Sequence, residues 1–296
     1  MRVAFFGQSG PYAPVALRQL LAGAGPYQIA LVVEGRRRLA DRVEHRVFKP
    51  HPAPLPAGEN LKDIACAAGV PVLQTSEVND AGAVRRIAEH HIDTIVCVGF
   101  DRLFRPPLLA TARLGAINAH PSPLPQLRGP SPIFWALKEG RRELAVTVHG
   151  IDAREDHGPI YGSTPFVMPS AASGEQIYRL AGRVAGTLLG SVLARMAASQ
   201  LVGIPQDDAR ATRAPRPKPE DALVRPSEWD CGPLRDFACG APFFRTPWLR
   251  FDDQLFFVRR GLDAERGRRA PVEYALQGST LVVRCRDGVV HFEVQT

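Results

Sequence analysis

The sequence lacks the features that mark several common classes of protein. No apolar run approaches the roughly 18 residues that a membrane-spanning helix needs, so we expect no membrane partner. The five cysteines form no CxxC pair and no metal-ligand spacing, which is typical of reduced thiols in a cytoplasm. We therefore expect a cytoplasmic protein without a metal site.

The sequence also lacks a dinucleotide-binding motif and an evident catalytic nucleophile. The first apolar run is followed by Gln8-Ser9-Gly10, which does not complete G-x-G-x-x-G, the fingerprint of nicotinamide dinucleotide binding. No Ser, Cys or Thr stands beside a paired base as an evident nucleophile. These absences argue against hydride transfer and against a covalent enzyme intermediate.

Apolar runs that resemble strands alternate with amphipathic runs that resemble helices along residues 1–203. We expect strands at 1–7, 29–35, 70–74, 93–100, 114–120 and 145–152, and helices at 14–25, 59–69, 81–91, 130–140 and 173–200. Ser173 and Gln176 form a plausible capping box at the start of the longest helix. The alternation predicts an α/β fold with a Rossmann-like parallel sheet, whose ligands lie beyond the carboxyl ends of the strands.

Composition then changes twice along the chain. Residues 204–221 are rich in proline and charge, lack periodicity and predict a linker. Residues 222–296 contain two candidate hairpins, at 248–260 and 280–294, the second turning at Asp287-Gly288. We therefore expect a first domain over 1–203, a linker over 204–221 and a small β domain over 222–296.

The net charge of +7 is unevenly distributed. The densest basic run, residues 36–49, holds six Lys or Arg against Asp41 and Glu44. Such a run can meet phosphates, although its composition alone favours a solvated surface loop. Residues 222–296 hold 11 basic and 10 acidic side chains, so their composition does not by itself indicate a nucleic-acid surface.

A stretch that reads NAHPSPLPQLRGPSP (118–132) places polar groups at the end of a predicted strand. Asn118 and His120 are two residues apart, so they point to the same face of the strand. An Asn amide can donate to a developing oxyanion, and a His can move a proton near neutral pH. The prolines that follow stiffen the loop and can hold such groups in place.

A third group is needed to orient the imidazole, and the segment 151–162 supplies three candidates. Asp156 precedes Gly158 by two residues and is the best placed, while Asp152 and Glu155 compete for the role. An Asn, a His and an Asp without a nucleophile suit direct transfer of an acyl group to an incoming amine. The alternative is that all of them are turn and cap residues.

The ordered combination of these segments resembles a known family. The pattern consists of Asn118-Ala119-His120, then Ser122 to Gly129 (SPLPQLRG), then Asp152 to Gly158 (DAREDHG). It is similar to the formyltransferases that use 10-formyltetrahydrofolate, a family that includes the methionyl-tRNA enzyme. Pro121, Pro123 and His157 depart from the tRNA enzyme's usual residues.

The resemblance implies roles for individual residues. Asn118 and His120 would stabilise and protonate the tetrahedral intermediate, and Asp156 would support His120. The co-substrate 10-formyltetrahydrofolate would lie against Val98, Gly99, Phe100, Asp101, Arg102, Leu103 and the loop containing Asp152. The acceptor would meet Ser122, Arg128 and Gly129, together with Arg36, Arg37 and Arg38 of the basic run.

The resemblance also implies an OB-like β-barrel over 222–296 and leaves the acceptor open. The first hypothesis is the amino group of initiator methionyl-tRNA, which would make that tRNA a partner. The second is a small amine, such as an amino sugar nucleotide or a specialised metabolite. A 10-formyltetrahydrofolate hydrolase and a binding protein without catalysis are further alternatives.

Overall fold

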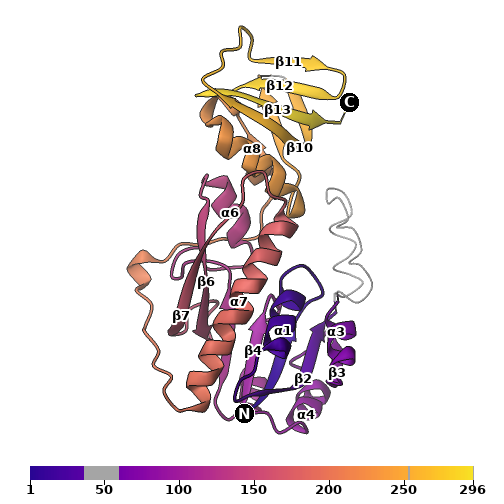
Figure 1. Cartoon of the computed structure of the whole chain (residues 1–296), viewed down its shortest axis with the longest axis vertical. Helices are drawn as coiled ribbons and strands as arrows, with labels where there is room; N and C mark the ends of the chain where they lie inside the picture. The colour runs from indigo at the N-terminus through magenta and orange to yellow at the C-terminus, as the bar shows by residue number, and fades with distance from the viewer. Residues whose placement is uncertain (37–59, 253, 296) are drawn as a thin grey trace.

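The computed structural model describes residues 1–36, 60–252 and 254–295. A seven-stranded sheet forms the first part of the chain, and a six-stranded sheet lies beyond one end of it (Figure 1). None of the helices in the described ranges is both long and apolar enough to cross a membrane.

The part of the chain that contains the first sheet has an α/β architecture, as the sequence predicts. In spatial order its strands are β3 (Val72–Thr75), β2 (Gln28–Gly35), β1 (Arg2–Gly7), β4 (Thr94–Val98), β5 (Ala116–His120), β6 (Glu143–Gly150) and β7 (Ile160–Val167). The strands from β3 to β5 are parallel, which confirms the predicted sheet there. The order reverses between β1 and β4, so the expected ligand crevice lies above these strands.

The expectation of a sheet that is parallel throughout is wrong for its last two strands. β6 runs antiparallel to both β5 and β7. The β6–β7 pair is antiparallel because the short segment between Gly150 and Ile160 contains no helix, whereas a parallel crossover needs a dozen or more residues. β7 itself was not predicted, because Gly162 and Pro165 weaken its strand pattern; Pro165 is tolerated on this edge strand.

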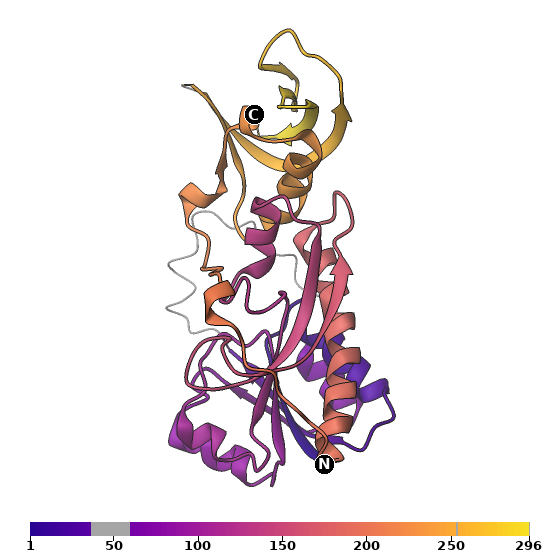
Figure 2. The ribbon, with the colours of Figure 1, turned by 90° about the vertical axis from the view of Figure 1, so that its left-hand side faces the viewer.

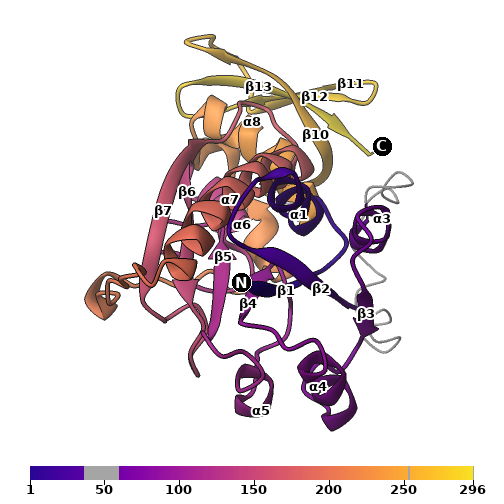
Figure 3. The ribbon, with the colours of Figure 1, turned by 60° about the horizontal axis from the view of Figure 1, so that its bottom comes forward.

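Helices cover both faces of this sheet, because alternate strand residues point to opposite sides. In β1, Val3 and Phe5 pack on one face, whereas Ala4 and Phe6 pack on the other. One face is covered by α1 (Ala13–Ala22), α3 (Leu61–Ala67) and α7 (Gly174–Ala197), and the other by α4 (Ala81–Ala88) and α5 (Pro106–Leu109), as Figure 3 shows.

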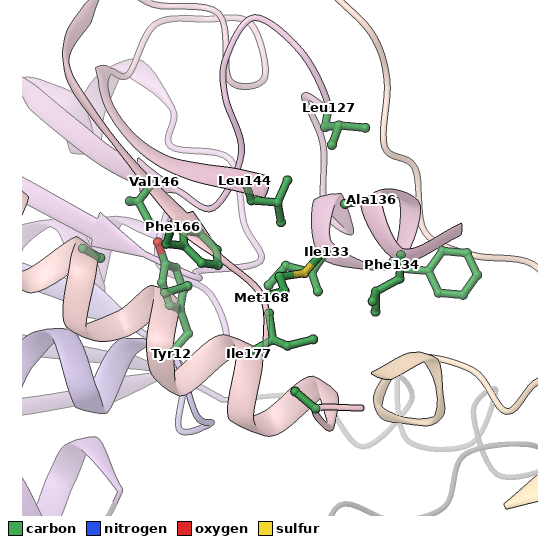
Figure 4. Close-up of a cluster of buried hydrophobic side chains, with 14 of the residues drawn as sticks. Tyr12, Leu127, Ile133, Phe134, Ala136, Leu144, Val146, Phe166, Met168 and Ile177 are labelled. Atoms are coloured by element: carbon green, nitrogen blue, oxygen red, sulfur yellow. The ribbon is translucent and has the colours of Figure 1, made fainter. Parts of the chain in front are cut away.

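The longest helix, α7, packs against α1 in the layer that covers the first face. Its predicted capping box is present, with Ser173 accepting from the Gln176 N–H and the Gln176 side chain accepting in return. A Cβ at Gly186 would lie 2.4 Å from the Cβ of Gln19, so this glycine lets α7 approach α1 closely. Figure 4 shows Ile177 of α7 and Ile133 of α6 (Pro132–Lys138), together with Met168, in one apolar cluster.

The second sheet belongs to the C-terminal part of the chain. Its spatial order is β11 (Tyr274–Gln277), β12 (Thr280–Arg284), β13 (Gly288–Val294), β10 (Gln254–Arg266), β9 (Trp248–Phe251) and β8 (Leu223–Val224). Both predicted hairpins are present, as β9–β10 and β12–β13. The sheet is open, with edges at β11 and β8, so the expected OB-like barrel is not confirmed.

Helix α8 (Cys231–Gly240) joins the two parts and was not predicted. Gly232, Pro233 and Gly240 make this segment a poor helix former by propensity. Burial overrides propensity here: Phe237 is fully buried, and its ring centroid lies 5.6 Å from that of Phe134 in α6. The cores of the two parts therefore meet, and the predicted division into domains stays a prediction.

Candidate active site

The predicted trio converges at the carboxyl end of β5, the strand that contains Asn118 and His120. The Asn118 amide nitrogen donates to Asp156 Oδ1 over 3.2 Å, and His120 Nδ1 lies 3.6 Å from Asp156 Oδ2. His120 is only 5% exposed, so its environment is set by the protein rather than by bulk water. The structure thus brings an amide donor, an imidazole and a carboxylate to one point.

The proline loop, residues 121–131, determines which nitrogen of His120 is active. His120 Nε2 lies 3.0 Å from the Leu127 carbonyl oxygen. A carbonyl can only accept, so Nε2 carries the proton, and Nδ1 is the atom that faces Asp156. This is a physical role for the stiff loop: it fixes the tautomer and the ring orientation of His120.

Asp156 is held in place by backbone geometry as well as by its partners. Its φ of 51° lies in the left-handed region, which costs a non-glycine residue about 1 kcal/mol or more. Its Oδ2 accepts from the Gly129 N–H over 2.8 Å. The turn therefore holds the carboxylate beside Asn118 and His120.

Electrostatics keep Asp156 ionised. Burial favours the neutral acid and by itself raises the pKa of Asp156. The imidazoles of His120 and His149, together with the Gly129 N–H, outweigh burial and hold the pKa of Asp156 far below its usual range. Asp156 is consequently a hydrogen-bond acceptor at neutral pH.

The two competing carboxylates face other partners. Asp152 accepts from the Arg154 N–H over 2.8 Å, and its other oxygen lies 2.6 Å from His157 Nδ1. Glu155 pairs with Arg213 at the surface. Of the three candidates, Asp156 is the one that contacts Asn118 and His120.

One residue of the cluster escaped sequence reasoning. His149 lies opposite Asn118 in the β5–β6 ladder, is 2% exposed, and its Nε2 is 3.2 Å from the Asn118 amide nitrogen. Its Nδ1 lies 2.8 Å from the Gly150 carbonyl oxygen, which can only accept, so Nδ1 carries a proton; Nε2 faces Asn118 and lies 3.5 Å from Asp156 Oδ1. His149 thus orients the Asn118 amide. The signal in the sequence was a lone His in an alternating strand.

We expect His149→Ala to lower turnover by about 10-fold, well below the effect of removing a general acid–base. The loss follows because the Asn118 amide would keep only its bond to Asp156. Steady-state kinetics on the folded variant measures it. A loss as large as that of Asn118→Ala would mean that His149 itself touches the reacting atoms.

The predicted acceptor-binding residues of the proline loop are mostly turned inward. Ser122 is fully buried and its hydroxyl donates to the Gln126 carbonyl over 2.8 Å, which indicates a structural role. Arg128 is 8% exposed and donates to Gln206 and Asp208. Gly129 offers its N–H to Asp156. Contact of Ser122 or Arg128 with an acceptor is therefore not supported by their geometry.

The segment predicted to meet the folate follows β4 beside the trio. Val98 is buried at the end of the strand, Gly99 is exposed with a φ of 59°, and Leu103 is 66% exposed. Asp101 and Arg102 pair with each other at 3.4 Å. The partly exposed ring of Phe100 packs against Phe6 and Phe104. The segment thus offers exposed backbone and one exposed apolar side chain at the crevice.

Most of the basic run, residues 36–49, lies outside the residues that the structure describes. Arg36 is exposed at the end of β2, where its guanidinium donates to the Gln74 side chain. Arg37 and Arg38 lie outside the described residues. Within the described ranges, no three His, Cys, Asp or Glu side chains are grouped so that they could hold a metal ion.

Gly158 brings the Asp156 turn against β6. A Cβ at this position would lie 2.0 Å from the Gly150 carbonyl oxygen, so Gly158→Ala must separate the turn from the strand. We expect a loss of about 1–3 kcal/mol of unfolding free energy, the usual cost of overpacking. Urea unfolding measures it, with Gly232→Ala as control because nothing lies within 4 Å of that Cβ. Equal stability of the two variants would contradict the close approach.

Comparisons with known proteins agree with this arrangement. Residues 1–187 match the family described as formyl transferase. The chain is 30% identical over 261 residues to the methionyl-tRNA formyltransferase of Chlorobium chlorochromatii (strain CaD3), covering 88% of this chain and 79% of that protein.

Solved structures show the same fold at lower identity. An N-formyltransferase from Helicobacter canadensis, in complex with folinic acid and dTDP-3-aminofucose, is 13% identical with a TM-score of 0.66, covering 99% of both chains. The methionyl-tRNA formyltransferase from Clostridium thermocellum is 11% identical with a TM-score of 0.59, covering 100% of this chain and 99% of that chain.

Proposed function

The chain belongs to the formyl transferase family, and we propose that it moves the formyl group of 10-formyltetrahydrofolate to the amino group of an acceptor. The observation that carries the proposal is the convergence of Asn118, His120 and Asp156 around one point. The family accounts for the class of enzyme, a transferase of one-carbon groups. The trio accounts for how such a transfer would proceed.

The reaction forms one bond, breaks one bond and moves one proton. The amine nitrogen attacks the formyl carbon, and the carbonyl oxygen takes negative charge as the tetrahedral intermediate forms. The Asn118 amide donates one of its two hydrogens to that oxygen and keeps the other on Asp156 Oδ1. The bond from the formyl carbon to the folate nitrogen then breaks, and the leaving nitrogen is protonated. The overall proton transfer is from the attacking amine to the folate nitrogen.

His120 and Asp156 manage this proton. With Nε2 committed to the Leu127 carbonyl, His120 exchanges its proton through Nδ1, which is the atom nearest Asp156. The ionised Asp156 stabilises the imidazolium that forms when Nδ1 is protonated. No step needs a nucleophilic side chain or a metal ion, in keeping with the composition of the site.

The folate donor is proposed to bind along Val98–Leu103 and the loop around Asp152. This segment follows β4 at the strand-order reversal, where α/β sheets bind their ligands. Its exposed backbone and the apolar side chain of Leu103 suit a flat heterocycle. These are properties of the residues present, and they support the placement of the donor next to Asn118.

For the acceptor we propose initiator methionyl-tRNA, because the curated relative from Chlorobium carries that activity in its name.

Charge in the C-terminal sheet favours a second candidate, a small amine. Most arginines there pair with carboxylates, for example Arg260 with Glu293 at 2.9 Å and Arg286 with Asp230 at 2.7 Å. Paired arginines offer little free charge to a phosphate backbone.

Single-turnover transfer from 10-formyltetrahydrofolate tests both candidates. Charged initiator methionyl-tRNA and a dTDP-linked amino sugar are offered separately, with His120→Ala as the inactive control. Transfer to the tRNA supports the first candidate, and transfer to the amino sugar alone supports the second. Release of formate without any amine product would instead indicate a hydrolase.

A further inference from the structure

The segment predicted to be a linker lies against the two loops that build the site. Residues 204–221 run along the outside of the first part toward the C-terminal sheet, as Figure 2 shows in orange. The Arg128 N–H donates to the Thr212 carbonyl over 2.9 Å, and the Ala214 N–H donates to the Arg128 carbonyl over 2.7 Å. The Leu127 N–H donates to Thr212 Oγ1 over 2.9 Å. This part of the segment is therefore fastened to the proline loop.

Gln206 connects both loops through four hydrogen bonds. Its amide nitrogen donates to the Asp156 carbonyl over 3.0 Å and to the Gly158 carbonyl over 2.8 Å. Its amide oxygen accepts from Arg128 Nε over 3.0 Å and from Nη2 over 2.8 Å. A primary amide has two donor hydrogens and two lone pairs, so its capacity is filled.

The orientation of this amide follows from its partners. Rotating it by half a turn would set its oxygen against two carbonyl oxygens and its NH₂ against the guanidinium donors. Arg128 is 8% exposed and therefore needs the acceptors that Gln206 and Asp208 supply. Gln206 thus has one favourable arrangement, and that arrangement fixes the distance between the two loops.

The loops that Gln206 joins meet again at the carboxylate. Asp156 has a φ of 51°, which the surrounding structure must maintain. Gly129, the neighbour of Arg128, donates its N–H to Asp156 Oδ2. A shift of either loop would therefore change the position of the carboxylate relative to His120.

We infer that Gln206 is a positioning residue for formyl transfer: it holds the Asp156 turn and the proline loop at a fixed separation. The side chain acts through Asp156, because it bonds the main-chain carbonyl of that residue, while its other bonds go to Gly158 and Arg128. The expected effect of Gln206 on kcat rests on the proposed function, whereas its expected effect on the stability of the two loops does not.

Gln206→Glu tests the inference with little change of shape. The variant keeps an acceptor for Arg128 and replaces the two N–H donors with an oxygen facing two carbonyls. We expect amide hydrogen exchange in 127–131 and 152–158 to rise by about 10-fold or more, since opening within these loops would become easier. We expect kcat to fall by at least about 10-fold, towards the 10²-fold that a 1 Å misplacement can cost.

Gln200→Glu is the matched control, because Gln200 is exposed just after α7. It should change neither exchange nor kcat. If Gln206 acts through Asp156, Gln206→Glu should lose most of its kinetic effect in an Asp156→Ala background. Unchanged exchange in Gln206→Glu, or full additivity with Asp156→Ala, would overturn the inference. A wild-type enzyme that formylates no amine would refute the proposed function and leave the exchange result to stand.

Discussion

Replacing His120 with Ala is expected to lower kcat by about 10²–10⁴-fold, the usual contribution of a general acid–base. Among the described titratable groups, His120 alone has one ring nitrogen beside Asp156 and the other bonded to a carbonyl of the proline loop. Without it, the leaving folate nitrogen has no positioned proton donor. Single-turnover formyl transfer from 10-formyltetrahydrofolate measures the loss directly.

Two further variants separate chemistry from folding. His120→Gln can still donate to the Leu127 carbonyl through its amide nitrogen but cannot exchange a proton. It should therefore retain the melting temperature of the wild type and show the same loss of kcat. His90→Ala, at the opposite end of the sheet, should keep full activity. Full activity in a folded His120→Ala variant would disprove the mechanism.

Much of the fold was predictable because local sequence carries its signals. Strands β1, β2, β4 and β5 are buried on both faces, so each forms an apolar run that alternation with helices makes recognisable. The capping box of α7 is likewise a local signal that the structure confirms. For the trio, position at a strand end and in a glycine turn made Asn118, His120 and Asp156 candidates, and the family resemblance supplied the roles expected of them.

The features that escaped prediction depend on contacts between distant segments. β7 is an edge strand whose partner sets its conformation, and α8 is a helix because Phe237 packs against Phe134. His149 gains a role only when β6 pairs antiparallel with β5 and sets it opposite Asn118. Gln206 lies about 50 residues from Asp156, in a segment whose composition predicts a linker. No local pattern encodes these pairings.

Replacing Asn118 with Ala is expected to lower kcat by about 10²–10³-fold, the usual effect of deleting one oxyanion donor. The amide nitrogen lies 3.2 Å from both His149 Nε2 and Asp156 Oδ1, so its direction is set before substrate binds. An amide nitrogen carries two hydrogens, so the oxyanion replaces the contact with His149 while the bond to Asp156 remains. Such a donor stabilises the charge that develops in the transition state more than it stabilises the neutral formyl group. The dissociation constant of the folate donor should therefore change little.

Asn60→Ala provides the matched control for this variant. Asn60 caps α3 by accepting from the Asp63 N–H over 2.8 Å, so its removal should cost about 1 kcal/mol of stability and leave kcat unchanged. The contrast isolates the effect of an active-site amide from that of a lost hydrogen bond. If Asn118→Ala instead weakened donor binding and left kcat intact, Asn118 would be a ground-state contact, and the oxyanion would need another donor in the site.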